Sequence, residues 1–329
     1  MSTTTGSTGL SSHPARALAV VGAVSIAQVV LVLLFVWSAS RAAPHHLPIA
    51  VAGPPQASGP VAHGIGAARP GAFDIKVLPD DGAARSAVTG RQVYAALSIG
   101  RTGATLYTAS AASPTVAQLL SQAIPAAVRQ ASPGATVTIT DLAPNPTDDR
   151  NGAGLTIALI PICITSIAAG ALLTLLVTSR RTRVAAVLGY AAATGLLSEL
   201  ILQTVLGVLT GNWLATAATL GLACLAISAA GAAAVAALGI PGIGLAGFVI
   251  FFFGFPFSGA TSAWQFVPTP WGQVAQYLPV GAADTSLRAV AFFAGSSSGP
   301  PLSVLAAWAV LGLIILAFVR RGEATPQSA

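Results

Sequence analysis

Long apolar segments separated by short polar links dominate the pattern of hydrophobic and polar positions along the chain. A helix needs about 18 or more consecutive apolar residues to cross a bilayer. By this criterion the sequence predicts spans over residues 17–38, 153–178, 184–209, 213–237, 240–257 and 302–319. The expected fold is therefore an α-helical polytopic membrane protein with six transmembrane helices.

The first span, 17–38, has a second interpretation as a signal peptide, since Ser38, Ala39 and Ser40 resemble a small-residue cleavage site. Its apolar run is longer than the roughly 7–15 residues of a signal-peptide core. We therefore expect a retained anchor. The residues before it, 1–16, are rich in Ser, Thr and Gly and are expected to form a disordered cytoplasmic tail.

The long segment 39–152 is expected to form a small extracytoplasmic α/β domain between the first two helices. A Pro/Gly-rich lead containing Pro44, Pro48, Pro54, Pro55 and Pro60 comes first. The pattern then predicts strands over 73–78, 94–99, 105–107 and 135–140, and helices over 82–93 and 114–130. Alternating helices and strands are typical of α/β layers, and about 110 residues suffice for one independent core.

The segment 258–300 differs from the other links. Pro256 ends the preceding apolar helix, and the segment contains Trp264, Trp271, Tyr277, Pro279, Asp284 and Arg288. Trp and Tyr favour the membrane–water interface, and non-helical backbone at membrane depth requires protein or a cavity around it. The sequence predicts a re-entrant or interfacial helical hairpin. Asp284 and Arg288 argue against a seventh span and are expected to pair at i, i+4 spacing.

Composition and charge support a membrane protein with a defined orientation. Charged residues make up only 7% of the chain, against roughly 25% in soluble domains. The basic residues beside the spans are Arg16, Arg180, Arg181, Arg183, Arg320 and Arg321. The positive-inside rule places them in the cytoplasm, together with both termini and the tail 320–329. The net charge of +6 then arises from the basic residues that orient the spans. The expected partner is therefore the lipid bilayer of the cell membrane, and we expect no binding of nucleic acid.

Two short motifs match enzyme signatures without their structural context. Residues 242–247 fit G-x-G-x-x-G but begin a span, and residues 295–299 fit G-x-S-x-G although the last histidine is His63. The only lysine, Lys76, follows Ile75, so a P-loop G-K-[ST] is excluded. Histidines and cysteines show no metal-type spacing. We therefore expect no catalytic residues, no cofactor and no metal, and we expect that the protein is not an enzyme.

Glu199 is the most informative single residue, because it lies near the middle of the span 184–209. An intramembrane carboxylate is a functional-site hypothesis by default, so Glu199 and Gln203, four residues on, are candidates for a transport path. The alternative is a protonated glutamate that links helices. Arg180, Arg181 and Arg183 are either a topology anchor or a docking surface for a cytoplasmic partner.

The layout as a whole resembles ABC-2-type transporter permeases, in particular the YhgE/Pip-like membrane proteins. The resemblance rests on residues 47–55 after the anchor, residues 92–97 in the external domain, and the stretch from Phe255 through Trp271 to Pro279. Gly53 and Pro54 stand where that family often has an Asn-Asp pair, and the link 238–243 lacks charge.

This resemblance implies a permease subunit of an exporter that works as a homodimer and is powered by a separate cytoplasmic ATPase subunit. The implied cargo is an amphiphilic drug, a lipid or a cell-envelope precursor. Two alternatives remain open: a non-transporting scaffold or receptor whose external domain binds a partner, and a proton-coupled exporter that uses Glu199.

Overall fold

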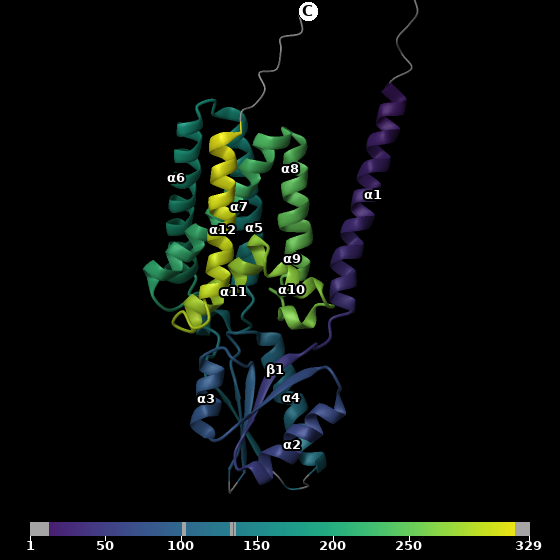
Figure 1. Ribbon diagram of the computed structural model, residues 1–329, viewed down its shortest axis with the longest axis vertical. Helices are drawn as coiled ribbons and strands as arrows, with labels where there is room; N and C mark the ends of the chain where they lie inside the picture. Colours follow the sequence, from purple (N-terminus) through teal and green to yellow (C-terminus); the bar gives the residue numbers. More distant parts are fainter. Residues whose placement is uncertain (1–12, 101–102, 132–133, 135, 320–329) are drawn as a thin grey trace, which may run out of the picture.

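The computed structural model describes residues 13–100, 103–131, 134 and 136–319. It consists of a bundle of long helices and an α/β domain at one end of that bundle (Figure 1). The long helices are α1 (His13–Ser40), α5 (Gly154–Leu176), α6 (Arg180–Glu199), α7 (Trp213–Leu238) and α12 (Gly299–Phe318). The short helices α8 (Pro241–Ala246) and α9 (Gly254–Phe257) are joined by a π-helical stretch, Gly247–Phe253.

Five helices in the described part of the chain are long and apolar enough to cross a membrane. The predicted span 240–257 corresponds to the shorter apolar helix Pro241–Phe257. These helices are those of a multi-pass helical membrane protein. Residues 13–16, predicted to belong to a disordered tail, form the start of α1, whereas the predicted tail segments 1–12 and 320–329, with Arg320 and Arg321, lie outside the described residues.

Local signals fix where the helices begin and end. The side chain of Ser179 accepts a hydrogen bond from Thr182 N and caps α6, and Asn212 caps α7 in the same way through Ala215 N. α7 ends at Gly239, which has a φ of +70°, and Pro241 occupies the first turn of α8. A tight Gly-x-Pro corner therefore separates these two apolar helices.

Small residues allow the helices to pack closely around α7, which lies at the centre of the bundle. A Cβ atom added at Gly170 of α5 would lie 2.1 Å from the carbonyl oxygen of Ser228. Added at Gly195 of α6, it would lie 2.6 Å from Gly221 Cα. Close backbone approach through small residues is the usual way in which membrane helices associate, since lipid supplies no hydrophobic driving force.

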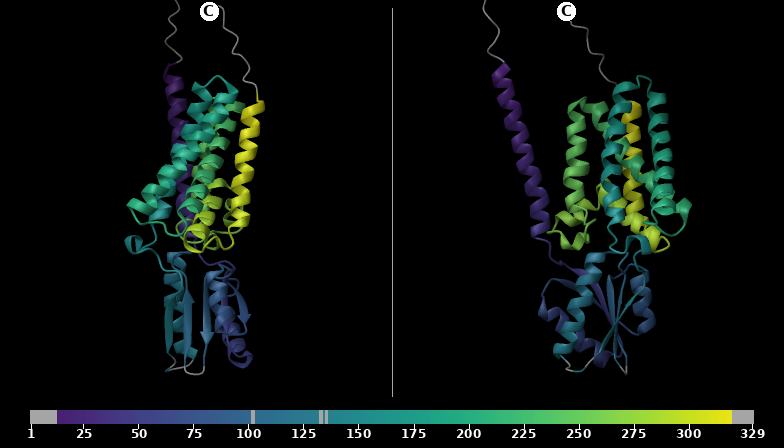
Figure 2. Two further views of the ribbon diagram at one scale, coloured as in Figure 1. Left: turned by 90° about the vertical axis from the view of Figure 1, so that its left-hand side faces the viewer. Right: turned by 180° about the vertical axis from the view of Figure 1, so that it is seen from behind.

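α1 stands apart from this bundle and approaches it only near the end that faces the α/β domain (Figures 1 and 2). Its apolar side chains are exposed along the whole span, from Leu18 at 73% to Trp37 at 37%. The ring of Trp37 meets the ring of Phe257 edge to face, with 6.1 Å between centroids. The rest of α1 presents an uncovered apolar surface.

The α/β domain, called the external domain below after the location expected from the sequence, contains a five-stranded sheet in the order β2-β1-β3-β4-β5. Its strands are β1 (Leu47–Ala52), β2 (Phe73–Leu78), β3 (Ala95–Ile99), β4 (Ala104–Thr108) and β5 (Val137–Asp141). β1 is parallel to both β2 and β3, β4 is antiparallel to β3, and β5 is parallel to β4. α3 (Asp81–Thr89) covers one face, and α2 (Pro55–Ala68) and α4 (Pro114–Ala131) cover the other.

The predicted strands and helices beyond residue 73 are confirmed, with shifts of a few residues at their ends. The interpretation of the preceding residues as a Pro/Gly-rich lead is wrong, because they form β1 and α2. β1 lies between β2 and β3 and is buried from Leu47 to Ala52, except for the partly exposed Pro48. The domain therefore begins almost directly after α1.

Residues 258–300, which we call the junction segment, lie between the helical bundle and the α/β domain (Figure 1). They contain a 3-10 turn (Trp264–Phe266), α10 (Trp271–Ala275) and α11 (Pro279–Phe292). Ala263 and Phe266 join the domain core on the α2/α4 side, and Phe293 joins the core beside α3. The segment contains helices, as the hairpin prediction requires, and the backbone of its irregular part bonds mostly within the segment. It also contacts the residues just before β1, because Ala43 N and His45 N donate to Phe266 O and Gln265 O.

Candidate functional site

Arg288 of α11 joins four segments of the chain. Its Nε donates to Asp284 Oδ1 at 3.0 Å, and the two side chains are only 6% and 8% exposed. Its Nη1 donates to Ala111 O of the external domain at 3.3 Å. Its Nη2 donates to Thr156 Oγ1 of α5 and to Ala260 O, both at 3.1 Å. The i, i+4 pair predicted from the sequence is confirmed, and it holds the external domain against the bundle.

Arg91 approaches the same region from the external domain. It lies in the turn between α3 and β3 with a φ of +55°, and its Nη1 donates to Thr285 O at 2.9 Å. Its guanidinium also lies 5.3 Å from the centre of the Phe293 ring, a cation–π contact. Burial lowers the pKa of the Arg91 guanidinium, and the nearby positive charge of Arg288 acts in the same direction.

Further hydrogen bonds fix the external domain on the junction segment. Each pairs a domain residue with one between 261 and 297: Ser297 Oγ to Gly90 O (3.1 Å), Tyr94 OH to Gln265 Oε1 (3.1 Å), Thr115 Oγ1 to Thr261 O (3.0 Å), and Ser113 Oγ to Ser262 O. The contacts come from several turns of the domain. The domain is therefore attached to the junction segment at several points.

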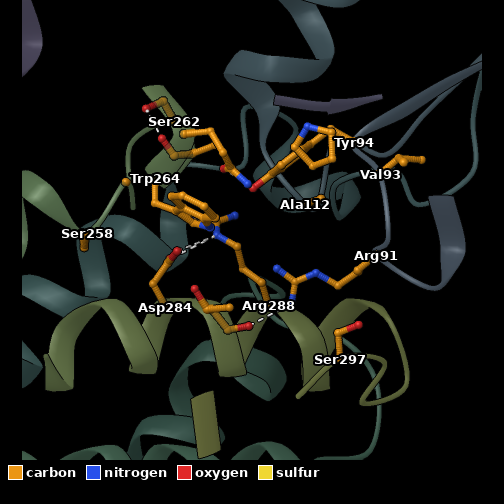
Figure 3. A pocket seen from close by; sticks show the side chains of 15 residues that line it. Arg91, Val93, Tyr94, Ala112, Ser258, Ser262, Trp264, Asp284, Arg288 and Ser297 are labelled. Carbon is orange, nitrogen blue, oxygen red and sulfur yellow. Dashed lines mark hydrogen bonds and ion pairs between the residues drawn. The ribbon is translucent and has the colours of Figure 1, made fainter. Parts of the chain in front are cut away.

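A cavity of about 250 Å³ lies within this junction. Figure 3 shows Arg91 and Tyr94 entering it from the external domain, Asp284 and Arg288 from α11, and Trp264 from the junction segment. Burial raises the pKa of the Asp284 carboxyl, while the Arg288 guanidinium opposes that change. Sequence reasoning identified Trp264, Asp284 and Arg288 but missed Arg91, because the cavity forms only in the tertiary structure.

The other members of the predicted hairpin have separate roles. Pro256 lies in α9, which ends one residue later, and Pro279 occupies the first turn of α11. Trp271 is 39% exposed and Tyr277 is 71% exposed. Such amphipathic rings are typical of a membrane interface. Trp264, in contrast, lines the junction cavity.

Glu199 and Gln203 form a second candidate site. Glu199 is the last residue of α6, before the π-helical stretch Leu200–Val205, and is fully buried. Gly195, one turn earlier, meets Ala217 and Gly221, so this face is turned towards α7. Gln203 Nε2 donates to Gly211 O at 3.2 Å.

The oxygen atoms at this second site lack partners. Among the described residues, the two carboxylate oxygens of Glu199 have no hydrogen-bond partner, and the same is true of the amide oxygen of Gln203. Such buried acceptors call for a proton or a hydrogen-bond donor. The sequence places Glu199 near the middle of its span, but in the structure it lies closer to the end of the helical segment Arg180–Val205 than to its middle.

The three arginines of the predicted cluster differ in exposure. Arg180 and Arg181 are exposed in the first turn of α6. Arg183 is 5% exposed, and its Nε and Nη2 donate to Val177 O at 3.0 and 2.7 Å. Arg183 thus fixes the turn between α5 and α6, and the exposed cationic surface consists of its two neighbours.

Within the described ranges, no group of three His, Cys, Asp or Glu residues could hold a metal ion. Cys163 and Cys224 are buried in the bundle. Comparison of the chain with protein-family models, with curated proteins and with solved structures finds no match.

Proposed function

We propose that the chain is the permease subunit of an ABC-2-type exporter in the plasma membrane, moving an amphiphilic drug, a lipid or a cell-envelope precursor. One observation carries the proposal: α1 is apolar and exposed along its length, and it meets the bundle only near its outer end. An exposed apolar helix needs lipid or another helix against it. An apolar helix surface that faces the bilayer suits a cargo that arrives from lipid.

The arrangement of the helices supports six spans with both termini in the cytoplasm. Followed along the chain, α1, α5, α6, α7, the α8–α9 unit and α12 alternate in direction (Figure 1). The turn before Arg180 lies at the end of the bundle opposite the α/β domain. Basic residues at that end fit a cytoplasmic location, with the α/β domain outside.

A second copy of the chain and a separate ATPase complete the proposed exporter. The uncovered surface of α1 suits packing between two copies in a homodimer. Arg180 and Arg181 are exposed cations at the proposed cytoplasmic end and suit docking of the ATPase. The buried, unpartnered oxygens of Glu199 and Gln203 are the proposed contact of the pathway with a hydrogen-bond donor on the cargo.

The test is affinity purification of the full chain in a mild detergent, followed by identification of co-purifying proteins. We expect a P-loop ATPase with the wild-type chain and its loss from the double variant Arg180→Ala/Arg181→Ala. The matched control is Arg69→Ala in the external domain, which should retain the ATPase. No ATPase with any variant, together with export that is independent of ATP, would refute the proposal.

The role of Glu199 is tested by Glu199→Gln and Glu199→Leu, with export normalised to the amount of protein in the membrane. Glutamine preserves size and hydrogen bonding, so a pathway role predicts normal protein levels and impaired export. A role as a protonated link between helices predicts normal export for glutamine and reduced protein level for leucine. Unchanged levels and export in both variants would remove Glu199 from the pathway.

One observation favours a receptor as the second candidate function. A cavity of about 760 Å³ lies at the far end of the external domain, lined by Gly53, Asp80, Ser98 and Thr138 among others. It lies beyond the carboxyl ends of β1 and β3, where ligands bind in open α/β sheets. An isolated complex of the external domain with a second protein, and no ATPase, would favour this alternative.

A further inference from the structure

The junction cavity carries an excess of positive charge. Among the described residues that line it, the ionisable groups that are charged at neutral pH are Arg91, Asp284 and Arg288. Asp284 neutralises Arg288 through the ion pair described above. One positive charge, that of Arg91, is left in a cavity of about 250 Å³ between two parts of the molecule.

Arg91 has few of the partners that a guanidinium normally takes. Among the residues that the structure describes, its one hydrogen bond runs from Nη1 to Thr285 O, although a guanidinium offers five N–H donors. In the described part of the chain, no carboxylate lies within ion-pair distance of it. Asp284 also attracts Arg91, but its carboxylate is already paired with Arg288. The three groups therefore keep a net positive charge in a partly buried site, which is unfavourable and leaves a place for a negative charge.

Neighbouring groups suit an oxyanion. Figure 3 shows the guanidinium of Arg91 turned towards the side chain of Arg288, with Trp264 beside the Arg288 guanidinium. Arginine forks bind phosphate through paired hydrogen bonds, and an indole N–H is a pure donor. The volume is larger than a single phosphate group requires, so its substituent or water also fits.

We propose that the junction cavity binds a phosphate group, held by Arg91 and bordered by Arg288 and Trp264. The phosphate is either a free or soluble phosphate or the headgroup of a lipid. Its chemistry is the same in both cases. The exposed rings of Trp271 and Tyr277 on the same segment place a lipid headgroup within reach. Bound phosphate would join the external domain to α11. This proposal does not depend on transport.

The experiment uses the purified full chain in a detergent without phosphate, with the fluorescence of tryptophan and the melting temperature as readouts. One arm titrates inorganic phosphate against chloride at matched ionic strength. The other adds phosphatidic acid to the micelles, against diacylglycerol of the same chain length. A response to inorganic phosphate supports a free phosphate, and a response to phosphatidic acid alone supports a headgroup. No response in either arm overturns the proposal.

The variants assign the response to the cavity. Loss of a charge-assisted pair weakens binding by about tenfold or more, so Arg91→Gln should raise the dissociation constant by that factor. Arg91→Lys keeps the charge but loses the paired hydrogen bonds, so its dissociation constant should lie between those of the wild type and Arg91→Gln. The matched control is Arg85→Gln, an exposed arginine of the same domain, which should bind like the wild type. Equal binding by the wild type and Arg91→Gln overturns the assignment.

A measurement on the wild-type chain covers the case in which Arg91→Gln does not fold. Phenylglyoxal modifies arginine side chains, and mass spectrometry identifies the modified positions. The phosphate-bearing ligand should slow modification of Arg91 by at least severalfold while leaving Arg85 unchanged. Equal rates at Arg91 with and without ligand overturn the proposal.

Discussion

Two Asp–Arg pairs with the same i, i+4 spacing allow the junction to be tested within one chain. Asp81 and Arg85 on α3 are each 52% exposed, with a distance of 2.9 Å from Arg85 Nε to Asp81 Oδ2. Asp284 and Arg288 on α11 are 8% and 6% exposed, at 3.0 Å. Chemistry, spacing and distance are nearly equal, so burial and the additional partners of Arg288 are the main differences.

The expected losses of stability differ accordingly. Arg85→Gln should cause only a small loss, because exposed ion pairs contribute little and the other contact of Arg85, with the Tyr107 ring at 4.5 Å, is also made by an exposed side chain. Arg288→Gln leaves Asp284 buried without its partner, a change that costs about 3–5 kcal/mol. It also weakens the contacts to Ala111 and Ala260 that join the external domain to the junction segment.

Hydrogen exchange measured by mass spectrometry on the full chain is the appropriate assay. A loss of about 3 kcal/mol corresponds to an increase of roughly a hundredfold in the frequency of opening. In Arg288→Gln, exchange should accelerate in the peptides around residues 110–116 and 258–266. Exchange in the central strand β1 should remain slow, since the domain separates from the bundle without unfolding.

The double variant Asp284→Leu/Arg288→Met provides a further check. Removing both charges also removes their desolvation penalty, so part of the loss should be recovered. The carbonyl group of Ala111 would still lack the Arg288 donor, whereas Ala260 O keeps the hydroxyl of Thr156 at 2.7 Å. Recovery should therefore be incomplete. If Arg288→Gln accelerated exchange no more than Arg85→Gln, the ion pair would not hold the junction together.

Three further predictions concern the domain, the bundle and the topology. A soluble fragment of residues 45–145 should melt cooperatively and one of residues 70–142 should not, because the shorter fragment lacks β1 between β2 and β3; equal melts would contradict this. Gly195→Ala should destabilise the detergent-solubilised protein by about 1–3 kcal/mol, because the added methyl group overpacks against α7. Gly189 has open space around it, so Gly189→Ala should stabilise the protein by up to about 1 kcal/mol. Thermal unfolding of the two variants distinguishes these outcomes. In a background without Cys163 and Cys224, a cysteine at Arg181 should resist a membrane-impermeant thiol reagent in intact cells and one at Gln56 should react; the opposite result would reverse the topology.

The fold could be predicted from sequence where hydrophobic periodicity was the dominant signal. The long helices and the elements after residue 73 follow from that signal. β1 and α2 were missed because of their prolines. Pro48 is tolerated because it lies near the start of β1, where pairing with β3 begins only at Ile49. Pro55 is tolerated in the first turn of α2, where its missing N–H would have had no partner.

The junction could be predicted only in its local part. The spacing of Asp284 and Arg288 on one helix indicates a pair, and the structure confirms it. The contact of Arg91 with Thr285 joins residues 194 positions apart, so no local pattern could reveal it. The only unusual local feature of Arg91 is its left-handed backbone, which is itself a property of the folded chain.

The position of Arg288 late in the sequence also sets an order of events during biosynthesis. All strands of the external domain have been translated once Asp141 is added, so its sheet is able to form while α5 and the later helices are still to be made. Arg288 is added almost 150 residues later, and until then Ala111 lacks the donor that secures it to α11. A chain that stalls before the junction segment therefore carries its external domain without these attachments, with the surface around Ala111 open to chaperones and proteases. Attachment of the domain thus distinguishes a finished chain from an unfinished one.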